Sequence, residues 1–315
     1  MESQKSRDHR LQTLKWALNR LPTKAPAKPV HHEKDLLQAS TILSIEQSLL
    51  QNETGYDFAF GIEKNGLKYL APKRMSILPD LSSSKIVNEY VRGFWINKDK
   101  DEIANHFWYY LFFPPFRLGK QFNKKLGSSL IELFNRKSST DKNATLKYIN
   151  QLPASAYIMA FSPPLKRNNF STRWVIYGMN FREMKQFIYS IFGNNSCIPS
   201  EFSKVQWKEL GIILSIKDGE LLPVYGLEFI FSKNMSSRKI TSFLKLLNTN
   251  SQMNRYNTSS ITEWISKNPT YYILQPENLS TKLWLNHIKF TIQEDTIHSI
   301  KSYFGLIFPR RNWEK

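Results

Sequence analysis

The feature that most constrains the fold of this chain is an order of elements that recurs along it: a helix, two or more strands, then a helix or the end of the unit. We predict such units at residues 35–94, 142–193, 200–249 and 259–308, and a divergent one at 101–137. Hairpins linked through helices imply an antiparallel sheet that the helices cover on one side. The sequence therefore predicts an α+β protein of repeated αββα units, whose large sheet can close into a ten-stranded barrel with the helices outside.

The first unit carries a strong turn signal. Strands are predicted over 56–63 and 67–71, because Lys64-Asn65-Gly66 places Asn-Gly between two extended runs. A helix is predicted before this hairpin, over 35–50, and another after it, over 83–94.

The later units show clearer boundaries. Helix 181–192 begins at Asn180 with Glu183 three residues on, which is the pattern of a capping box. Two strands, 211–217 and 223–231, are joined through Asp218-Gly219. Further strands are predicted at 107–113, 156–162, 172–179, 271–275, 287–293 and 298–308, and further helices at 120–136, 146–152, 259–267 and from Ser236.

The N-terminal segment differs from the rest of the chain. Leu11, Leu14 and Leu18 recur at helical spacing, which predicts a basic amphipathic helix over 8–20. A stretch rich in Pro, Ala and Lys follows it and is typical of a linker. We therefore expect an N-terminal helix and linker at 1–34 and a single repeat domain at 35–315.

The charge balance favours an anionic partner. The chain has 44 Lys and Arg against 26 Asp and Glu, a formal net charge of +18. Nucleic acid, diphosphates and acidic peptides are all attracted by such a field. The basic residues are spread along the chain rather than blocked, so the charge indicates the sign of the partner and not its identity.

Several classes of function lack support. No run of about 18 apolar residues predicts a membrane-spanning helix, and the N-terminus lacks a secretory apolar region, so a cytoplasmic protein is expected. The single cysteine, Cys197, allows no internal disulfide and no cysteine-based zinc site. His287 and His298 lack the ligand spacing of a zinc site, so no protein-held metal is predicted. Neither a P-loop nor a G-x-G-x-x-G motif supports a nucleotide cofactor.

Polar and apolar side chains alternate along the later strands. The apolar faces can pack beneath the helices, while the opposite faces meet solvent in an open sheet or line the lumen of a closed one. In a lumen, cationic and phenolic groups would bind a polyanion and aromatic groups would surround an apolar tail. The opposite faces carry His287, Lys289, Thr291 and Gln293 on one strand, Ser299, Lys301 and Tyr303 on another, Arg173, Val175, Tyr177 and Met179 on a third, and Gly226, Glu228 and Ile230 on a fourth.

Repeated αββα units that close a ten-stranded antiparallel barrel resemble the ABBA-type aromatic and peptide prenyltransferases. Lys301-Ser302-Tyr303 matches a K-x-Y element of that family, and Arg173 with Tyr177 matches the ends of an R-x-x-x-Y element. An acidic strand residue that orients or deprotonates the acceptor corresponds to Glu63 or Glu228.

The resemblance implies a transferase of natural-product biosynthesis that moves a prenyl group from a prenyl diphosphate to an aromatic or peptide acceptor. Lys and Arg would stabilise the leaving diphosphate, tyrosine rings would shield the allylic cation, and a carboxylate would take the proton. Mg²⁺ can bridge the diphosphate, although the chain has no DDxxD motif. The substrate-binding residues that it implies are Arg173, Tyr177, His287, Lys289, Lys301 and Tyr303.

Two other readings stay open at the level of sequence. Net charge and aromatic content are also compatible with a nucleic-acid-binding protein that catalyses nothing. The basic helix 8–20 is compatible with a scaffold for an acidic peptide or protein partner.

Overall fold

A computed structural model of the chain describes eleven strands and seven helices. The described residues are 4–22, 42–48, 54–61, 84–91, 93–98, 108–113, 119–134, 139–164, 171–193, 202–203, 207–231, 236–249, 259–268, 272–275, 278–294 and 296–307. The strands are β1 (Ile42–Ser48), β2 (Thr54–Gly61), β3 (Gly93–Lys98), β4 (Trp108–Phe112), β5 (Tyr157–Ser162), β6 (Thr172–Met179), β7 (Glu209–Lys217), β8 (Glu220–Ile230), β9 (Tyr272–Gln275), β10 (Asn278–Gln293) and β11 (Thr296–Ile307). The helices are α1 (Gln4–Leu18), α3 (Lys85–Tyr90), α4 (Gly119–Phe134), α5 (Ser139–Asn150), α6 (Phe181–Phe192), α7 (Ser237–Thr249) and α8 (Ser259–Lys267), with a short turn of helix at 202–203.

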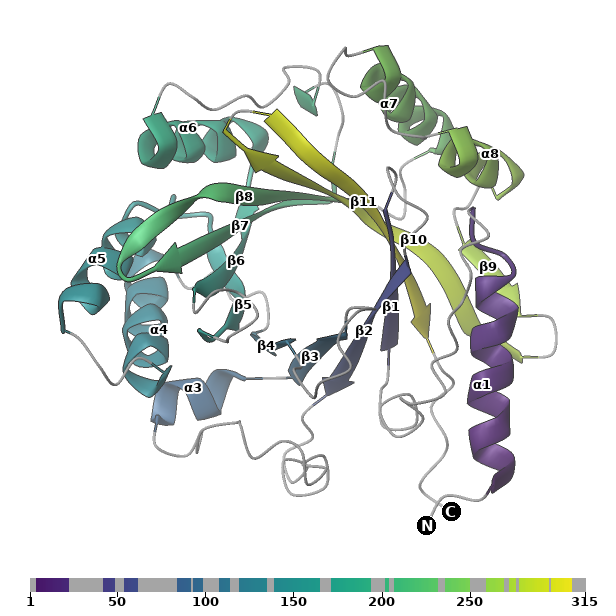
Figure 1. The fold of residues 1–315 in the computed structure, drawn as a ribbon, viewed down its shortest axis with the longest axis horizontal. Coiled ribbons are helices and arrows are strands. Elements are labelled where there is room, and N and C mark those ends of the chain that lie inside the picture. The colour runs from purple at the N-terminus through teal and green to yellow at the C-terminus, as the bar shows by residue number, and fades with distance from the viewer. Residues whose placement is uncertain are drawn as a thin grey trace.

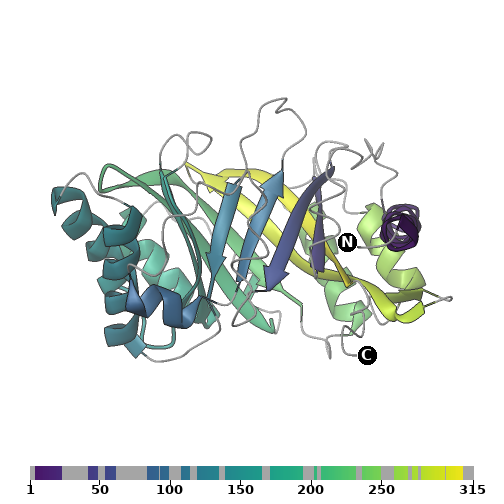
Figure 2. The same ribbon diagram turned by 90° about the horizontal axis from the view of Figure 1, so that it is seen from below.

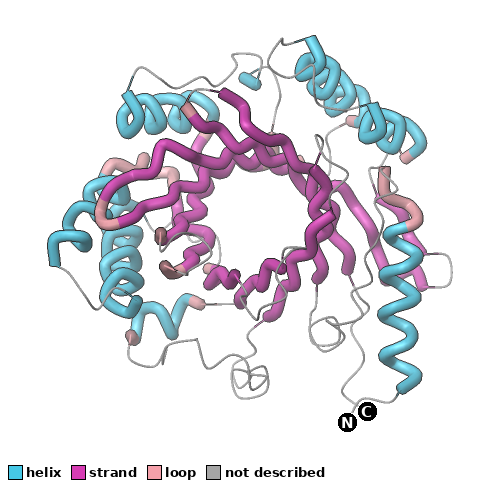
Figure 3. Tube along the Cα trace, viewed as in Figure 1, coloured by secondary structure: helices cyan, strands magenta, loops and turns pink. Residues whose placement is uncertain are grey.

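All described strands belong to one antiparallel sheet. If the pairings are followed from strand to strand, they lead back to the first strand, so the sheet closes on itself. The order is β11-β1-β2-β3-β4-β5-β6-β7-β8-β10-β9, and β11 also pairs with β10. Ten strands therefore form a continuous ring, which we call the barrel, while β9 flanks the first half of β10 outside it (Figures 1 and 3). The shortest junction joins β4 to β5, where Leu111 and Phe112 pair with Phe161 and Ala160.

The helices lie around the outside of the barrel, as the predicted fold class requires (Figure 3). Viewed from below, α3, α4 and α5 lie on one side and α1 and α8 on the other (Figure 2). Among the described residues, none of the helices is long and apolar enough to cross a membrane. The α+β class and the antiparallel sheet predicted from the sequence are confirmed.

The core lies between the barrel wall and the helices. On one side it centres on Phe229 of β8, whose ring lies 4.8 Å from Phe202, 4.8 Å from Trp207 and 5.3 Å from Phe290 between centroids. Phe243 of α7 joins the same cluster, 4.7 Å from Trp207. These rings bury the outward face of β8 and β10, so the alternate residues of both strands point inward.

Local signals explain why the elements begin and turn where they do. Asn180 and Glu183 form the predicted capping box at the start of α6, with both hydrogen bonds at 2.9 Å. Asp218 and Gly219 have φ values of 52° and 81°, which is the left-handed backbone that a tight hairpin turn between β7 and β8 requires. Both predictions are confirmed.

Helix α1 packs against the rest of the molecule. Leu14 and Ala17 are fully buried within the main hydrophobic core. The Trp264 Nε1 of α8 donates to the Arg20 carbonyl oxygen at 2.5 Å, just beyond the helix. The apolar face of this helix is therefore covered by the chain itself, while the predicted linker at 23–34 lies outside the described residues.

Two predicted helices are wrong in part. Residues 42–48, predicted as helix, form β1, in which Leu43 and Ile45 are buried on one face. Helix α3 ends at Tyr90, and Gly93–Lys98 form β3 instead of a helical end. Strand β1 is hydrogen-bonded to β11 along one edge and to β2 along the other. This pairing outweighs the local helical pattern of its sequence.

Other expectations were wrong or fall outside the described residues. Met179 was expected on the face of Tyr177, but a register shift at Gly178, whose φ is 94°, places Met179 in the outer core. In the unit predicted from residue 200, the part described before β7 includes a short turn of helix at 202–203, while 200–201 and 204–206 lie outside the described residues. The predicted turn at Lys64-Asn65-Gly66 and the strand at 67–71 lie outside the described residues.

Replacing Phe229 with Ala tests the outer core. We expect F229A to lower the free energy of unfolding by about 3–5 kcal/mol, because it leaves a cavity within a packed aromatic cluster. Y189A is the matched control, since Tyr189 is 57% exposed, and it should change stability by no more than about 0.5 kcal/mol. Urea denaturation measures both, and equal effects would contradict this packing.

Candidate active site

A cavity of about 490 Å³ lies inside the barrel. Its wall is mixed, with charged and phenolic groups beside an apolar surface. The apolar part consists of Phe112, Met159, Ala160, Val175, Ile213, Val224 and Ile230. The charged and phenolic part includes every described residue that the sequence singled out: Arg173, Tyr177, Glu228, His287, Lys289, Lys301 and Tyr303. Glu63 lies outside the described residues.

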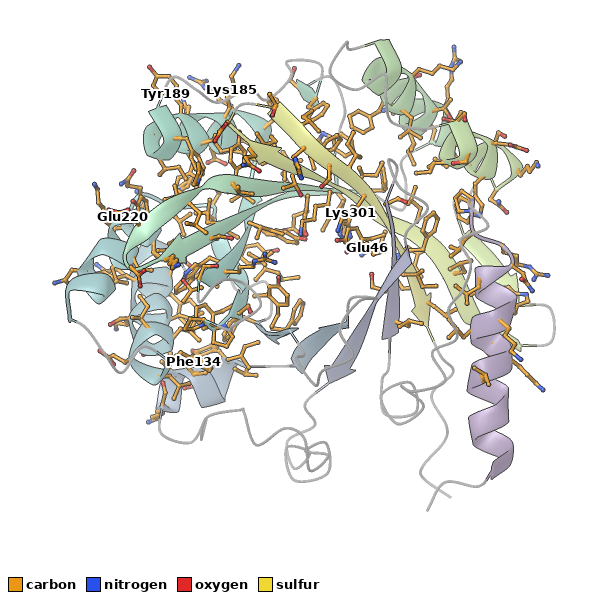
Figure 4. All side chains as sticks on the ribbon, viewed as in Figure 1. Glu46, Phe134, Lys185, Tyr189, Glu220 and Lys301 are labelled. Atoms are coloured by element: carbon orange, nitrogen blue, oxygen red, sulfur yellow. The ribbon has the colours of Figure 1, made fainter. Side chains whose placement is uncertain are left out.

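The first charged centre is Glu46 of β1. Its Oε1 accepts a hydrogen bond from Lys301 Nζ at 2.6 Å, and its Oε2 accepts one from the Tyr303 hydroxyl at 2.5 Å. Register explains the contact, because Glu46 lies directly opposite Tyr303 across β1 and β11. Figure 4 shows Glu46 and Lys301 side by side at the inner wall of the barrel. Burial raises the pKa of Glu46, but the charge of Lys301 and both hydrogen bonds outweigh it and hold the pKa below its ordinary value.

The second charged centre is Glu228 of β8. The hydroxyl of Tyr177 donates to Glu228 Oε2. On the other side, Oε1 lies 3.9 Å from His287 Nε2 and 4.0 Å from Lys289 Nζ. Burial, followed by the charge of Glu228 and the hydrogen bond to it, raises the pKa of Tyr177 well above its ordinary value. Tyr177 therefore remains a protonated donor and holds the carboxylate in place.

A glycine makes this contact across two strands possible. Tyr177, Gly211 and Glu228 lie opposite one another on β6, β7 and β8. A Cβ at residue 211 would overlap the Tyr177 ring. The missing side chain lets the phenol lie across β7 and reach the carboxylate on the next strand.

Basic groups gather beside these two carboxylates. Lys289 lies opposite Glu228 on one side and opposite Lys301 on the other. Burial lowers the pKa of Lys289, the charges of Arg173 and Lys301 lower it further, and the charges of Glu228 and Glu46 partly oppose them. Arg173 also donates to the Tyr110 hydroxyl at 3.5 Å. These positive charges repel one another in a partly buried site, so a bound anion would relieve the repulsion and stabilise their charged forms.

An aromatic stack links the two carboxylates. The rings of His287 and Tyr303 are stacked with centroids 4.2 Å apart and 12° between planes. Burial lowers the pKa of His287, Lys289 lowers it further, and Glu228 and Glu46 oppose this only in part. The imidazole is therefore neutral at neutral pH.

Two acidic residues that line the cavity, Glu46 and Glu209, were missed by the sequence analysis. Glu46 falls in the segment predicted as helix, although Ser44 and Glu46 alternate with the buried Leu43 and Ile45 as in a strand. That alternation is the signal that could have found it. Tyr157 and Glu209 form a further pair, in which the Tyr157 hydroxyl donates to Glu209 Oε1.

Metal and nucleic-acid sites find no support among the described residues. No three His, Cys, Asp or Glu side chains within them come together to hold a metal ion. In the described part of the aromatic segment 107–116, Tyr110 and Phe112 line the cavity and Leu111 and Phe113 are buried. Cys197, His31 and His32 lie outside the described residues.

Comparison with known proteins gives structural likeness only. No family model matches the chain, and no curated protein matches it in sequence. Among solved structures, 5-dimethylallyltryptophan synthase from Streptomyces coelicolor is similar with 9% identity and a TM-score of 0.46, over 94% of this chain and 91% of that one. AnaPT from Neosartorya fischeri is similar with 8% identity and a TM-score of 0.44, over 85% of this chain and 77% of that one.

Replacing Lys301 with Met tests the Glu46 centre. Without Lys301 the burial of Glu46 is less opposed, so its pKa should rise. A carboxylate with a lowered folded-state pKa contributes stability above its ordinary pKa and loses it as the pH falls through the folded-state value. We therefore expect K301M to cost about 1–3 kcal/mol at pH 7 and less near pH 4, measured by urea unfolding.

The matched control is K267M. Lys267 and Glu263 on α8 also make a 2.6 Å contact, but their side chains are 70% and 65% exposed, against 34% and 11% for Lys301 and Glu46. Solvent screens the exposed pair, so K267M should change stability little at either pH. If both variants behave alike, burial does not set the strength of the Lys301–Glu46 pair.

Proposed function

We propose that this protein is a prenyltransferase that moves a prenyl group from a prenyl diphosphate to an aromatic or peptide acceptor inside the barrel. One observation carries the proposal: a partly buried basic cluster lies beside a carboxylate fixed by a tyrosine, in a cavity that also has an apolar wall. A prenyl diphosphate has the two matching parts, an anionic head and an apolar tail.

The diphosphate head binds the basic cluster formed by Arg173, Lys289 and Lys301. Lys289 carries a lowered pKa because it is buried beside two other cations, so an anion there removes repulsion as well as adding attraction. The guanidinium of Arg173 adds a planar set of donors suited to phosphate oxygens. The apolar wall that includes Val175 and Ile213 takes the hydrocarbon tail.

Transfer begins when the allylic C–O bond breaks and its electron pair leaves with the diphosphate. The cations stabilise the charge that develops on that leaving group, and they do so in a cavity where electrostatic interactions are stronger than in water. The rings of Tyr177 and Tyr303, which line the cavity, attract and shield the allylic cation.

Glu228 completes the reaction as the proton acceptor. An electron pair of the acceptor forms the new bond to the allylic carbon, and the proton released from the attacking atom passes to Glu228 Oε1. Tyr177 already occupies Oε2, so Oε1 is the oxygen that faces the reactants. A positioned carboxylate in this role contributes about 10²–10⁴-fold in rate.

Neutralising Glu228 tests the proposal directly. The protein is incubated with dimethylallyl or geranyl diphosphate and a panel of aromatic acceptors and peptides, and products are detected by the prenyl mass increment. We expect transfer by the unaltered protein and a loss of about 100-fold or more in E228Q. E263Q, on the exposed face of α8, is the control and should match the unaltered protein. Full activity of E228Q would exclude Glu228 as the base.

Removing a lumen cation tests the donor site separately. We expect K289M to bind dimethylallyl diphosphate and inorganic diphosphate about tenfold more weakly by calorimetry, because a charge-assisted contact is lost. K147M removes a cation from the exposed face of α5 and should leave both affinities unchanged. Repeating the titration with added Mg²⁺ shows whether a metal strengthens the binding of either anion. Equal affinity of K289M and the unaltered protein would contradict the donor site.

A further inference from the structure

The side chains of His287 and Glu228 leave a space between them in which a hydroxyl group could hydrogen-bond to both. His287 Nε2 and Glu228 Oε1 face one another at 3.9 Å, which is too long for a hydrogen bond between them. Nε2 is buried and makes no hydrogen bond within the described part of the chain. A small polar group placed about 2.8–3.0 Å from both atoms would hydrogen-bond to each.

The protonation of His287 follows from its neighbour. The Asn286 side-chain nitrogen lies 3.1 Å from His287 Nδ1. An amide nitrogen only donates, so Nδ1 accepts and the single proton of the neutral imidazole lies on Nε2. His287 therefore offers the lumen a donor, fixed in direction by its stack on Tyr303.

Glu228 offers the opposite polarity. Its Oε2 already accepts from Tyr177, whereas Oε1 makes no hydrogen bond with the described residues and is left to accept one. Lys289 Nζ, 4.0 Å from the same oxygen, is a second donor beside the imidazole. An atom between these groups must donate once, to the carboxylate, and can accept from the imidazole and the ammonium.

Of the polar groups common on aromatic acceptors, a hydroxyl meets this requirement. Its proton satisfies Glu228, and the two lone pairs of its oxygen accept from His287 and Lys289. An indole N–H donates to Glu228 but leaves the His287 donor buried without an acceptor, and a methoxy group leaves the carboxylate without a donor. A buried polar group without its partner is costly, so the site discriminates strongly among these analogues.

We propose that the acceptor is a hydroxyl-bearing aromatic compound, a phenol or a tyrosine side chain, and that His287 selects it together with Glu228. This inference rests on the proposed prenyl transfer and names the acceptor class for it. His287 is then a specificity-determining residue, and its ring also packs on the tyrosine that binds Glu46.

The experiment compares acceptors that differ only at the polar group. 1-Naphthol, 1-methoxynaphthalene and indole are tested with the unaltered protein, for binding by fluorescence titration and for prenyl transfer with dimethylallyl diphosphate by mass spectrometry. We expect 1-naphthol to bind and to react more than about tenfold better than either analogue. This comparison needs no substitution, so it does not depend on the folding of a variant.

Replacing His287 with Phe removes the donor and keeps a ring that can stack on Tyr303. We expect H287F to lose about tenfold or more in kcat/KM and in affinity for 1-naphthol, to bind indole, which offers His287 no acceptor, at least as well as before, and to keep the KM for dimethylallyl diphosphate. H298F is the matched control, because His298 is exposed on β11 and does not line the cavity. A general disturbance of the lumen would instead weaken all ligands together.

The outcomes separate the two proposals. Prenyl transfer that is as fast to indole or 1-methoxynaphthalene as to 1-naphthol overturns the hydroxyl inference and leaves prenyl transfer standing. Selective binding of 1-naphthol, lost in H287F, without transfer to any acceptor overturns the proposed function and supports the hydroxyl site. Equal 1-naphthol affinity in H287F and H298F overturns the role of His287.

Discussion

The rest of the structure depends on the double pairing of β10. This strand pairs with β8 on one edge and with β11 on the other, and β11 pairs in turn with β1. A sheet with two free edges would expose its inward face to water, and its cations and carboxylates would be solvated independently. Because β10 joins both ends of the sheet, these groups share one enclosed cavity.

Enclosure changes what the same side chains do. At the surface, a lysine beside a glutamate contributes little to stability, because water screens the pair and the side chains are mobile. Inside the barrel, Glu46 keeps a lowered pKa against its own burial, and Lys289 is destabilised as a cation. Tyrosine hydroxyls hold Glu46, Glu209 and Glu228 in fixed directions. The lumen is therefore a preorganised polar surface, suited to binding an anion beside a group that accepts a proton.

Much of this could be predicted where the sequence signal is local. The cap at Asn180 and the turn at Asp218-Gly219 involve neighbours in the chain, and both were predicted. Strand alternation assigned Lys289 and Lys301 to one face correctly, because the side-chain period of a strand does not depend on its partners. It failed at Met179, where a register shift reverses the face. Residues 42–48 were predicted as a helix instead of β1, because one of the two strands that pair with β1, β11, lies at the other end of the described chain.

The sequence by itself determined the α+β class, the antiparallel hairpins and the faces of most later strands, since these follow from turn chemistry and from a two-residue period. Only the tertiary structure decided that Glu46 meets Lys301, some 250 residues later in the chain, and that Tyr177 reaches Glu228 across Gly211. The physical reason is that strand register and ring closure are collective: each depends on burying the whole outer face at once, and no local segment contains that information.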